Sequence, residues 1–355
     1  MNVAIIAHGL SNGGSERVAA LVANHYAQKG HRVLFLAVLC PQREYPLDGQ
    51  VIYQTIPAPK CTKATRFLRR SVVIDRELRE FGAEIAVSFL FKEAIVTNLR
   101  RTVPLVYSLR NDPGNTTRNP IQKALLLFSY RRAEGIAFQT QGAMAFFGAE
   151  IQKKGTVIPN PLTRNLPYWE PQHHEKRVIT ACRLNPQKNL PMLLKAFAVF
   201  HQAHPDYRLE IYGRGPEQEM LEDLCRALYM EDAVAFPGYS AQIHQVMATS
   251  AIFVLSSDFE GLSNSMLEAL AIGIPTICTD CPPGGAREYI TDGANGFLVP
   301  VGDVQALAEK MTALAENPAL CQWMSWQATQ VRQKLNPDRV LGQWEQLLKV
   351  GKEQP

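Results

Sequence analysis

Short apolar segments of strand length alternate with helix-length segments along nearly the whole chain. They cover residues 3–7, 33–39, 85–89, 105–109 and 135–138 in the first part, and 178–181, 209–212, 251–255 and 276–278 in the second. Continuously apolar strands that are separated by helices are typical of parallel sheets covered on both faces. The alternation therefore predicts an α/β protein with doubly wound, Rossmann-like sheets.

Two domains are expected, because 355 residues exceed what one ordinary core holds. Prolines and polar residues interrupt the alternation over 157–175, so we place the domains at 1–162 and 163–335. Residues 336–355 hold a closing amphipathic helix with apolar positions at 340, 341, 344, 347 and 348. In such sheets a ligand is expected beyond the carboxyl ends of the strands, in the cleft between the domains.

Composition favours a cytoplasmic protein. No run of about 18 apolar residues is present, and the first apolar segment is too short for the core of a signal peptide. Seven cysteines form an odd set without secretory context, which favours reduced thiols.

Charge is divided unevenly along the chain. Residues 1–160 hold 21 Lys and Arg against 11 Asp and Glu, whereas the remainder holds 16 against 22. A basic first domain predicts contact with an anionic partner, either phospholipid or a phosphate-bearing acceptor. The segment 60–73 mixes cations with apolar residues at near-helical spacing, which suits either peripheral contact with the inner face of an anionic membrane or an ordinary packed helix. Without a recognition motif, nucleic acid is not expected as a partner.

Three segments carry residue types suited to binding a phosphorylated ligand. Gly13 and Gly14 precede a helix, where backbone amides favour an anion, although such a pair is often only a turn. Arg183 and Lys188 lie on one strand-to-helix loop and could converge on a diphosphate or remain solvated. Glu260 lies in a loop and Glu268 on the helix after it, so two carboxylates can reach different parts of one extended ligand.

In this order and spacing, the motifs resemble those of a family 4 glycosyltransferase of the GT-B fold. Glu260 and Glu268 form an E-x7-E motif, and Gly13, Gly14, Arg183 and Lys188 occupy the expected segments. The resemblance covers essentially the whole chain, with supporting segments at 212–216, 236–239, 281–288 and 293–299. It implies two Rossmann-like domains facing a cleft, an acceptor side in the first, a donor side in the second, and a last helix that crosses back to the first.

The resemblance also implies roles for individual residues. Arg183 and Lys188 would hold the donor diphosphate and neutralise the departing nucleotide, Glu268 would bind the ribose, and Glu260 the transferred sugar. Other positions implied to touch the donor are Gly13, Gly14, Gly213, Gly238, Gly261, Leu262, Ser263 and Asn264. Members of this type retain anomeric configuration and use basic residues in place of a metal, so we expect neither metal nor cofactor beyond the nucleotide sugar.

The chain departs from the family at residues 110–113, Arg-Asn-Asp-Pro. Many relatives carry a histidine where this sequence has Arg110, and a subgroup of bacterial surface-polysaccharide transferases resembles the present pattern. Arg110 is therefore a candidate catalytic residue in place of that histidine, or else a loop cation that binds carbonyls. Asn111, Asp112 and His8 are candidate acceptor-side residues.

We expect a retaining glycosyltransferase that moves a hexose or N-acetylhexosamine, preferably from a UDP sugar, although a guanosine donor stays open. The acceptor would be a glycan or an oligosaccharide on polyprenyl diphosphate, in capsule, O-antigen or exopolysaccharide synthesis. The alternatives are a sugar-nucleotide epimerase on the same fold, a non-enzymatic sugar-nucleotide sensor, and a nicotinamide-dependent oxidoreductase. The last needs a G-x-G-x-x-G spacing that residues 8–14 lack.

Overall fold

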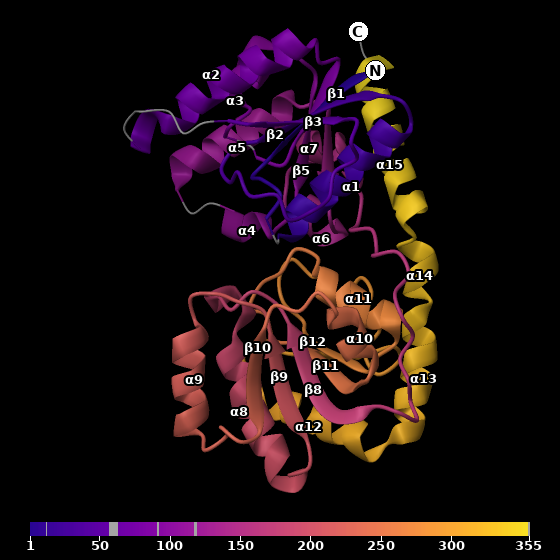
Figure 1. The fold of residues 1–355 in the computed structure, drawn as a ribbon. Coiled ribbons are helices and arrows are strands. Elements are labelled where there is room, and N and C mark those ends of the chain that lie inside the picture. The colour runs from indigo at the N-terminus through magenta and orange to yellow at the C-terminus, as the bar shows by residue number, and fades with distance from the viewer. Residues whose placement is uncertain (12, 57–62, 91, 117–118, 354–355) are drawn as a thin grey trace. The chain divides into compact units, whose positions relative to one another are not determined.

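The computed structural model describes residues 1–355 except 12, 57–62, 91, 117–118 and 354–355, and gives only the backbone of 63–65 and 350–353. The chain forms two compact units (Figure 1). The first comprises Met1–Pro161 together with Asp338–Pro355, and the second comprises Leu162–Pro337. The sequence placed these limits at 162/163 and 335/336, one and two residues away.

The first unit is built on a seven-stranded parallel sheet with the order β3-β2-β1-β4-β5-β6-β7. Its strands are β1 (Asn2–Ala7), β2 (Arg32–Ala37), β3 (Val51–Thr55), β4 (Ile85–Ser88), β5 (Leu105–Leu109), β6 (Gly135–Phe138) and β7 (Gly155–Val157). Its helices are α1 (Gly14–Gln28), α2 (Lys63–Phe81), α3 (Ile95–Arg100), α4 (Pro113–Thr116), α5 (Pro120–Arg132), α6 (Gln141–Ala145), α7 (Ala149–Gln152) and α15 (Pro337–Glu353).

Alternate residues of each strand enter different cores, as a sheet covered on both faces requires. Val3 and Ile5 of β1 pack in the core that includes α1 and α15, whereas Ala4 and Ile6 pack in the core that includes α2 and α5. The helices α2, α3 and α5 follow one another along this second face (Figure 1).

The last helix, α15, belongs to the first unit. Its apolar residues Val340, Leu341, Trp344, Leu347 and Leu348 are buried in the same core as β1 and α1. Trp344 is wholly buried, and its ring centroid lies 6.2 Å from that of Phe89. The amphipathic pattern at 337–349 is thus the part of the helix that fills this core.

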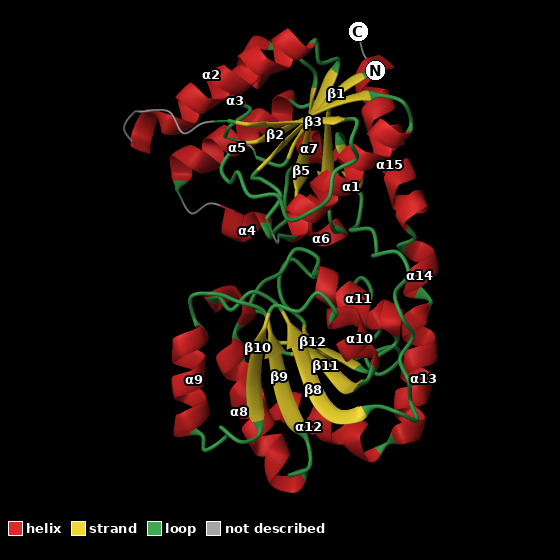
Figure 2. Ribbon diagram, viewed as in Figure 1, coloured by secondary structure: helices red, strands yellow, loops and turns green. Residues whose placement is uncertain are grey.

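The second unit has a six-stranded parallel sheet with the order β10-β9-β8-β11-β12-β13 (Figure 2). Its strands are β8 (Glu175–Ala181), β9 (Arg208–Tyr212), β10 (Val234–Gly238), β11 (Ser250–Leu255), β12 (Thr276–Thr279) and β13 (Phe297–Val299). Its helices are the 3-10 turn η1 (Pro186–Lys188) and α8 (Leu190–Ala203), α9 (Gln218–Ala227), α10 (Ile243–Ala248), α11 (Asn264–Ile272), α12 (Val304–Glu316), α13 (Pro318–Thr329) and α14 (Val331–Lys334).

Both sheets are doubly wound, which confirms the predicted fold class. Strand order reverses between β1 and β4 in the first unit and between β8 and β11 in the second. Ligands of open α/β sheets bind beyond the carboxyl ends of the strands at such reversal points. The loops after β8 and β11 are therefore the place to look for the second unit's site.

The structure also bears on the basic segment at 60–73. Its first residues, 60–62, lie outside the described residues, and the rest falls in α2. Within the described part of the chain, no helix is long and apolar enough to span a bilayer.

Candidate active site

The carboxyl edge of the second sheet gathers most of the predicted donor residues. Because all strands of this sheet are parallel, the loops after them emerge at one edge. At this edge the chain places Arg183 after β8, Gly213 after β9, Gly238 at the end of β10, Glu260 after β11 and Gly284 after β12.

Lys188 and Glu260 form an ion pair between the loops of β8 and β11. Lys188 Nζ contacts Glu260 Oε2, and the two side chains are 12% and 19% exposed. The Ser257 hydroxyl lies 3.4 Å from the same carboxylate oxygen. Burial is the largest single influence and lowers the pKa of Lys188. The charge and hydrogen bond of Glu260, together with the nearby Cys182 and Cys281, raise it by more in sum, so the net pKa lies above its ordinary value. The site therefore holds a charged lysine that is already balanced by a carboxylate.

Backbone and side-chain hydrogen bonds lock these two loops together. The Asp258 amide donates to the Gln187 carbonyl at 2.9 Å, and Gln187 Nε2 donates to the Phe259 carbonyl at 2.9 Å. Asn189 Nδ2 donates to Asp258 Oδ1 at 2.6 Å, and the Ser256 hydroxyl donates to the Lys188 carbonyl at 2.9 Å. The ion pair therefore sits on a fixed scaffold.

Two glycines permit close packing of the surrounding loops. A Cβ at Gly213 would lie 1.8 Å from the Cys182 carbonyl oxygen, beside Arg183, and the φ of Gly213 is +130°. A Cβ at Gly285 would lie 2.0 Å from the Gly261 carbonyl oxygen. Any side chain at either position would displace the segments that carry Arg183 and Glu260.

Helix α11 begins beside Glu260. Leu262 and Ser263 are buried, and Ser263 Oγ accepts a hydrogen bond from the Met266 amide at 3.4 Å as the N-cap. Asn264 is the first helical residue. The positive end of the helix dipole and the backbone amides of its first turn thus face the region after β11, an arrangement that favours an anion.

Glu268 on α11 has two partners that the sequence analysis did not identify. The Thr163 hydroxyl donates to Glu268 Oε1 at 2.7 Å, and His244 Nε2 lies 3.0 Å from Oε2. Glu268 is only 7% exposed. No spacing in the sequence marks Thr163 or His244, because they come from the segment before β8 and from α10, far from the E-x7-E motif.

Arg183 differs from Lys188. Its side chain is exposed, and no ion pair joins it to another residue in the described part of the chain. The structure therefore does not bring the two predicted diphosphate ligands to a common partner. Gly238 has a φ of +79°, a backbone conformation that favours glycine.

In the first unit, Arg110 is turned into the protein. Its Nε donates to Ser108 Oγ at 2.6 Å, and its Nη1 donates to the Ile158 carbonyl at 3.0 Å and to Asn160 Oδ1 at 3.2 Å. Its Cζ lies 5.1 Å from the ring centroid of Trp344. Burial lowers the pKa of Arg110, and no carboxylate among the described residues forms an ion pair with it.

Asn111 and Asp112 lie beside Arg110 but have different surroundings. Asn111 is exposed, and its Oδ1 accepts from the Asp112 amide at 2.9 Å. Asp112 is 5% exposed and accepts from the Gly114 amide at 3.0 Å and from Asn115 Nδ2 at 2.6 Å. The carboxylate of Asp112 thus closes the turn of α4.

The end of β1 brings a histidine near two acids. His8 Nδ1 lies 3.8 Å from Glu16 Oε1, and the His8 side chain is 46% exposed. Gly13 is buried as the N-cap of α1, Gly14 opens the helix, and Glu16 lies in its first turn. Sequence reasoning missed Glu93 after β4, whose pKa is raised by burial despite nearby cations that include His8.

The described residues contain no cluster of three or more His, Cys, Asp or Glu that could hold a metal ion. All six described cysteines are free.

Two family models match the chain. The model described as Glycosyltransferase Family 4 matches residues 12–165, and the model described as Glycosyl transferases group 1 matches residues 167–331. Between them they span nearly the whole sequence. The epimerase and oxidoreductase alternatives gain no support from these matches.

Individual relatives agree with the family models. An uncharacterised glycosyltransferase of Haemophilus influenzae is 26% identical, over 95% of this chain and 97% of its own. A Campylobacter jejuni enzyme named N-acetylgalactosamine-N,N'-diacetylbacillosaminyl-diphospho-undecaprenol 4-alpha-N-acetylgalactosaminyltransferase is 25% identical, over 89% of this chain and 90% of its own.

A solved structure shares the fold. Anabaena Alr3699/HepE in complex with UDP and glucose is 19% identical, with a TM-score of 0.83 that covers 98% of this chain and 99% of the other. With two doubly wound units and family models that match both, the chain belongs to the family 4 glycosyltransferases and is a glycosyltransferase.

Proposed function

We propose that the protein transfers a hexose or N-acetylhexosamine from a UDP sugar, with retention at the anomeric carbon, to an oligosaccharide carried on polyprenyl diphosphate. The product would enter a surface polysaccharide such as capsule, O-antigen or exopolysaccharide. Two comparisons support the substrates: the Anabaena structure holds UDP and glucose, and the Campylobacter enzyme's name gives a diphospho-undecaprenol acceptor.

The observation that carries the proposal is the Lys188–Glu260 pair beside the start of α11. A charged lysine and helix N-terminal amides at a strand-order reversal suit the phosphates of a nucleotide sugar. The neighbouring carboxylate suits hydroxyl groups, because an ionised carboxylate only accepts hydrogen bonds. The ion pair and the helix start thus offer groups complementary to both the phosphate end and the sugar end of one donor.

Binding the donor would exchange partners within this pair. Lys188, with the exposed Arg183, would turn to the diphosphate, while Glu260 would accept hydrogen bonds from the transferred sugar. As the bond between the anomeric carbon and the phosphate oxygen breaks, negative charge grows on the leaving UDP, where the cations stabilise it. The acceptor hydroxyl attacks from the same face, and its proton passes to the departing phosphate oxygen.

Other residues would hold the remaining parts of the donor. Glu268, oriented by Thr163 and His244, would accept hydrogen bonds from the ribose hydroxyls. The segment Gly261, Leu262, Ser263 and Asn264 would offer backbone amides, Gly213 would allow the close approach beside Arg183, and Gly238 would flank the base.

In the first unit, Gly13 and Gly14 would approach the donor phosphates, and His8 and Asn111 would face the acceptor. The contacts of Arg110 support a positioning role, because its guanidinium is occupied by Ser108, Ile158 and Asn160. The contacts of Asp112 support the same reading for its carboxylate. Positive charge from Lys188 and Arg183 would serve in place of a metal, so EDTA should leave transfer unchanged.

We assign membrane contact to the outer face of α2, α3 and α5. The exposed residues of these helices and of the turn after α3 include the large apolar residues Leu68, Val72, Leu99, Ile121 and Phe128 and the cations Arg69, Arg76, Arg79, Arg100, Arg101 and Lys123. Three of these cations, Arg76, Arg79 and Arg100, already form ion pairs with acidic residues. Such a mixture favours peripheral binding to an anionic bilayer, at the cytoplasmic face of the cell membrane. Binding to phosphatidylglycerol vesicles that weakens as salt rises would support it, and indifference to such vesicles at low salt would refute it.

The donor assignment is tested by thermal shift with UDP, GDP, ADP, CDP and NAD, since a ligand of the native state raises the apparent melting temperature. We expect a shift with UDP that disappears in Lys188→Ala. The matched control is Lys195→Ala, an exposed lysine on α8 of the same unit, which should keep the shift. A shift with NAD alone, or an unchanged UDP shift in Lys188→Ala, would contradict the proposal.

A further inference from the structure

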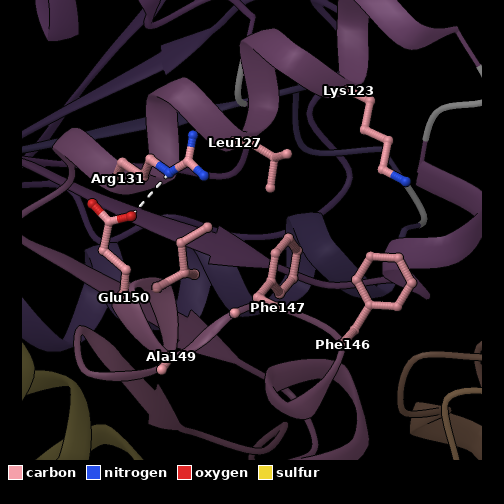
Figure 3. A pocket seen from close by; sticks show the side chains of 9 residues that line it. Lys123, Leu127, Arg131, Phe146, Phe147, Ala149 and Glu150 are labelled. Carbon is pink, nitrogen blue, oxygen red and sulfur yellow. Dashed lines mark hydrogen bonds and ion pairs between the residues drawn. The ribbon is translucent and has the colours of Figure 1, made fainter.

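A groove on the first unit lies between α5 and the segment that joins α6 to α7. It has a volume of about 370 Å³, within the range of small-molecule sites. Leu127 and Phe147 form its middle, Lys123 and Phe146 lie toward one end, and Arg131 and Glu150 lie at the other (Figure 3). The groove is thus apolar in the centre and charged at its ends.

The aromatic floor of the groove is anchored in the core. Phe147 is 4% exposed, and its ring centroid lies 5.5 Å from those of Tyr130 and of Phe138. Phe146 packs edge-on against Phe147 at 5.3 Å, yet 49% of its surface faces solvent. A large apolar side chain half open to water, held beside a preformed groove, favours an apolar ligand.

The two charged ends differ in net charge. Arg131 Nε lies 3.0 Å from Glu150 Oε2, so these two lining side chains balance each other's charge. No ion pair ties the exposed Lys123 ammonium to any residue that the structure describes. An anionic group would therefore be drawn to the Lys123 end, and an uncharged tail would extend toward the Arg131–Glu150 end.

The Lys123 end also adjoins the acceptor-side loop. A second, smaller cavity of about 30 Å³ shares Lys123, Leu127 and Phe146 with the groove and is lined as well by Pro113 and Gly114. These two residues directly follow Asn111 and Asp112. The lining therefore changes in order from a polar loop to one cation and then to the apolar floor of the groove.

We infer that this groove binds the first isoprenoid units of the lipid-linked acceptor, with the diphosphate near Lys123. The inference rests on the proposed function, which supplies an acceptor with sugar, diphosphate and prenyl chain in that order. The same order of polar, anionic and apolar parts matches the loop after β5, Lys123 and the floor formed by Leu127 and Phe147.

Three variants test the groove without disturbing the core. Lys123→Ala removes the cation, and Phe146→Ser removes the exposed ring. Gly148→Leu fills the trough: its backbone has ordinary dihedral angles, φ −66° and ψ 161°, and an added Cβ would meet no atom within 4 Å. The controls are Lys195→Ala and Tyr229→Ser, which change an exposed lysine and an 88% exposed aromatic of the second unit.

Farnesyl diphosphate, titrated by calorimetry below its micellar concentration and without vesicles, is the probe. We expect about tenfold weaker binding to Lys123→Ala and about fivefold weaker binding to Phe146→Ser and Gly148→Leu, with both controls like the wild type. The affinity for farnesol should be unchanged in Lys123→Ala, because farnesol has no anionic group for Lys123 to bind. Inorganic diphosphate should bind far more weakly than farnesyl diphosphate, because it lacks the apolar tail.

Several results would overturn the inference: unchanged farnesyl diphosphate binding in all three variants, equal losses in the controls, or inorganic diphosphate that binds as well as the prenyl compound. The inference would also be refuted if the variants bound phosphatidylglycerol vesicles more weakly but bound farnesyl diphosphate as the wild type does. That result would indicate general membrane contact. The UDP thermal shift separates this outcome from the proposed function, because UDP binding in the second unit does not depend on the groove.

Discussion

Lys188 in the second unit and Arg110 in the first are both largely buried cations that come after an interior strand of a parallel sheet. Lys188 is balanced by the Glu260 carboxylate, and its pKa lies above the ordinary value. Among the described residues, Arg110 contacts neutral oxygen atoms and the Trp344 ring and forms no ion pair, and burial lowers its pKa. A cation with a charged partner can exchange that partner for a ligand, whereas one tied to backbone and packing holds the structure together.

Lys188→Ala should give the largest effect. The change removes the cation that stabilises the leaving group and leaves Glu260 without its ion-pair partner. We therefore expect kcat/KM for transfer to fall about 10²–10³-fold while the fold persists. Steady-state transfer rates, with circular dichroism for the fold, check this. Full activity of the variant would show that Lys188 takes no part in the reaction, and the proposed difference in role between Lys188 and Arg110 would be wrong.

Arg110→Met should act on stability. Losing its hydrogen bonds to Ser108, Ile158 and Asn160 leaves buried acceptors unsatisfied, so the free energy of unfolding should fall by about 2 kcal/mol in urea titrations. The matched control is Arg183→Met, which alters an exposed arginine: its stability should change by less than about 0.5 kcal/mol while its transfer rate falls. If Arg110→Met were stable but inactive, Arg110 would belong with the reacting groups after all.

Glu260→Gln should sharpen the exchange idea. The amide of the variant cannot neutralise Lys188, so UDP, which lacks the transferred sugar that Glu260 would bind, should bind about fivefold more tightly, although transfer declines. Calorimetric titration of UDP into wild type and variant measures this. Weaker UDP binding in the variant would show that Glu260 assists the nucleotide and does not compete with it.

A third, more exposed charge cluster should give the smallest effect. Glu345 on α15 contacts Lys29 Nζ and His25 Nε2, both at 2.6 Å, and the hydrogen bond from Lys29 is the main cause of its lowered pKa; burial opposes the shift, and His25 adds to it. A depressed carboxyl pKa adds stability above the unfolded value and loses it as pH falls through the folded one. Glu345→Gln should cost less than about 1 kcal/mol at pH 7, and in urea titrations the difference should shrink as the pH falls through the lowered pKa of Glu345 and the carboxylate becomes protonated.

The interior of both sheets was predictable from sequence, and their borders were not. The apolar segments correspond to β1, β2, β4, β5, β6, β8, β9, β11 and β12. The missed strands, β3, β7, β10 and β13, are the four edges of the two sheets. An edge strand is covered on fewer sides, so its residues need not be continuously apolar: β3 is buried only at Val51, and β10 contains Pro237 and Gly238.

Motif spacing named residues that the structure gathers at the carboxyl edge of the second sheet, but it did not predict how their side chains pair. Sequence reasoning assigned Lys188 to phosphate and Glu260 to sugar, without the ion pair that joins them. It left Arg110 between a catalytic and a carbonyl-binding role, because the direction of a loop side chain depends on residues far along the chain, here Ile158 and Trp344. Thr163 and His244 reach Glu268 through tertiary packing alone.

The first unit's core is completed by a segment that is synthesised after the whole second unit. Residues 162–337 are continuous and build their core from one stretch of chain, whereas residues 1–161 keep one face open until α15 packs on them. Until α15 packs, the space that Trp344 fills is empty, and apolar surface of β1 and α1 is exposed. Removal of residues 338–355 should therefore leave the first unit prone to chaperone binding, whereas the second unit keeps every residue of its own core.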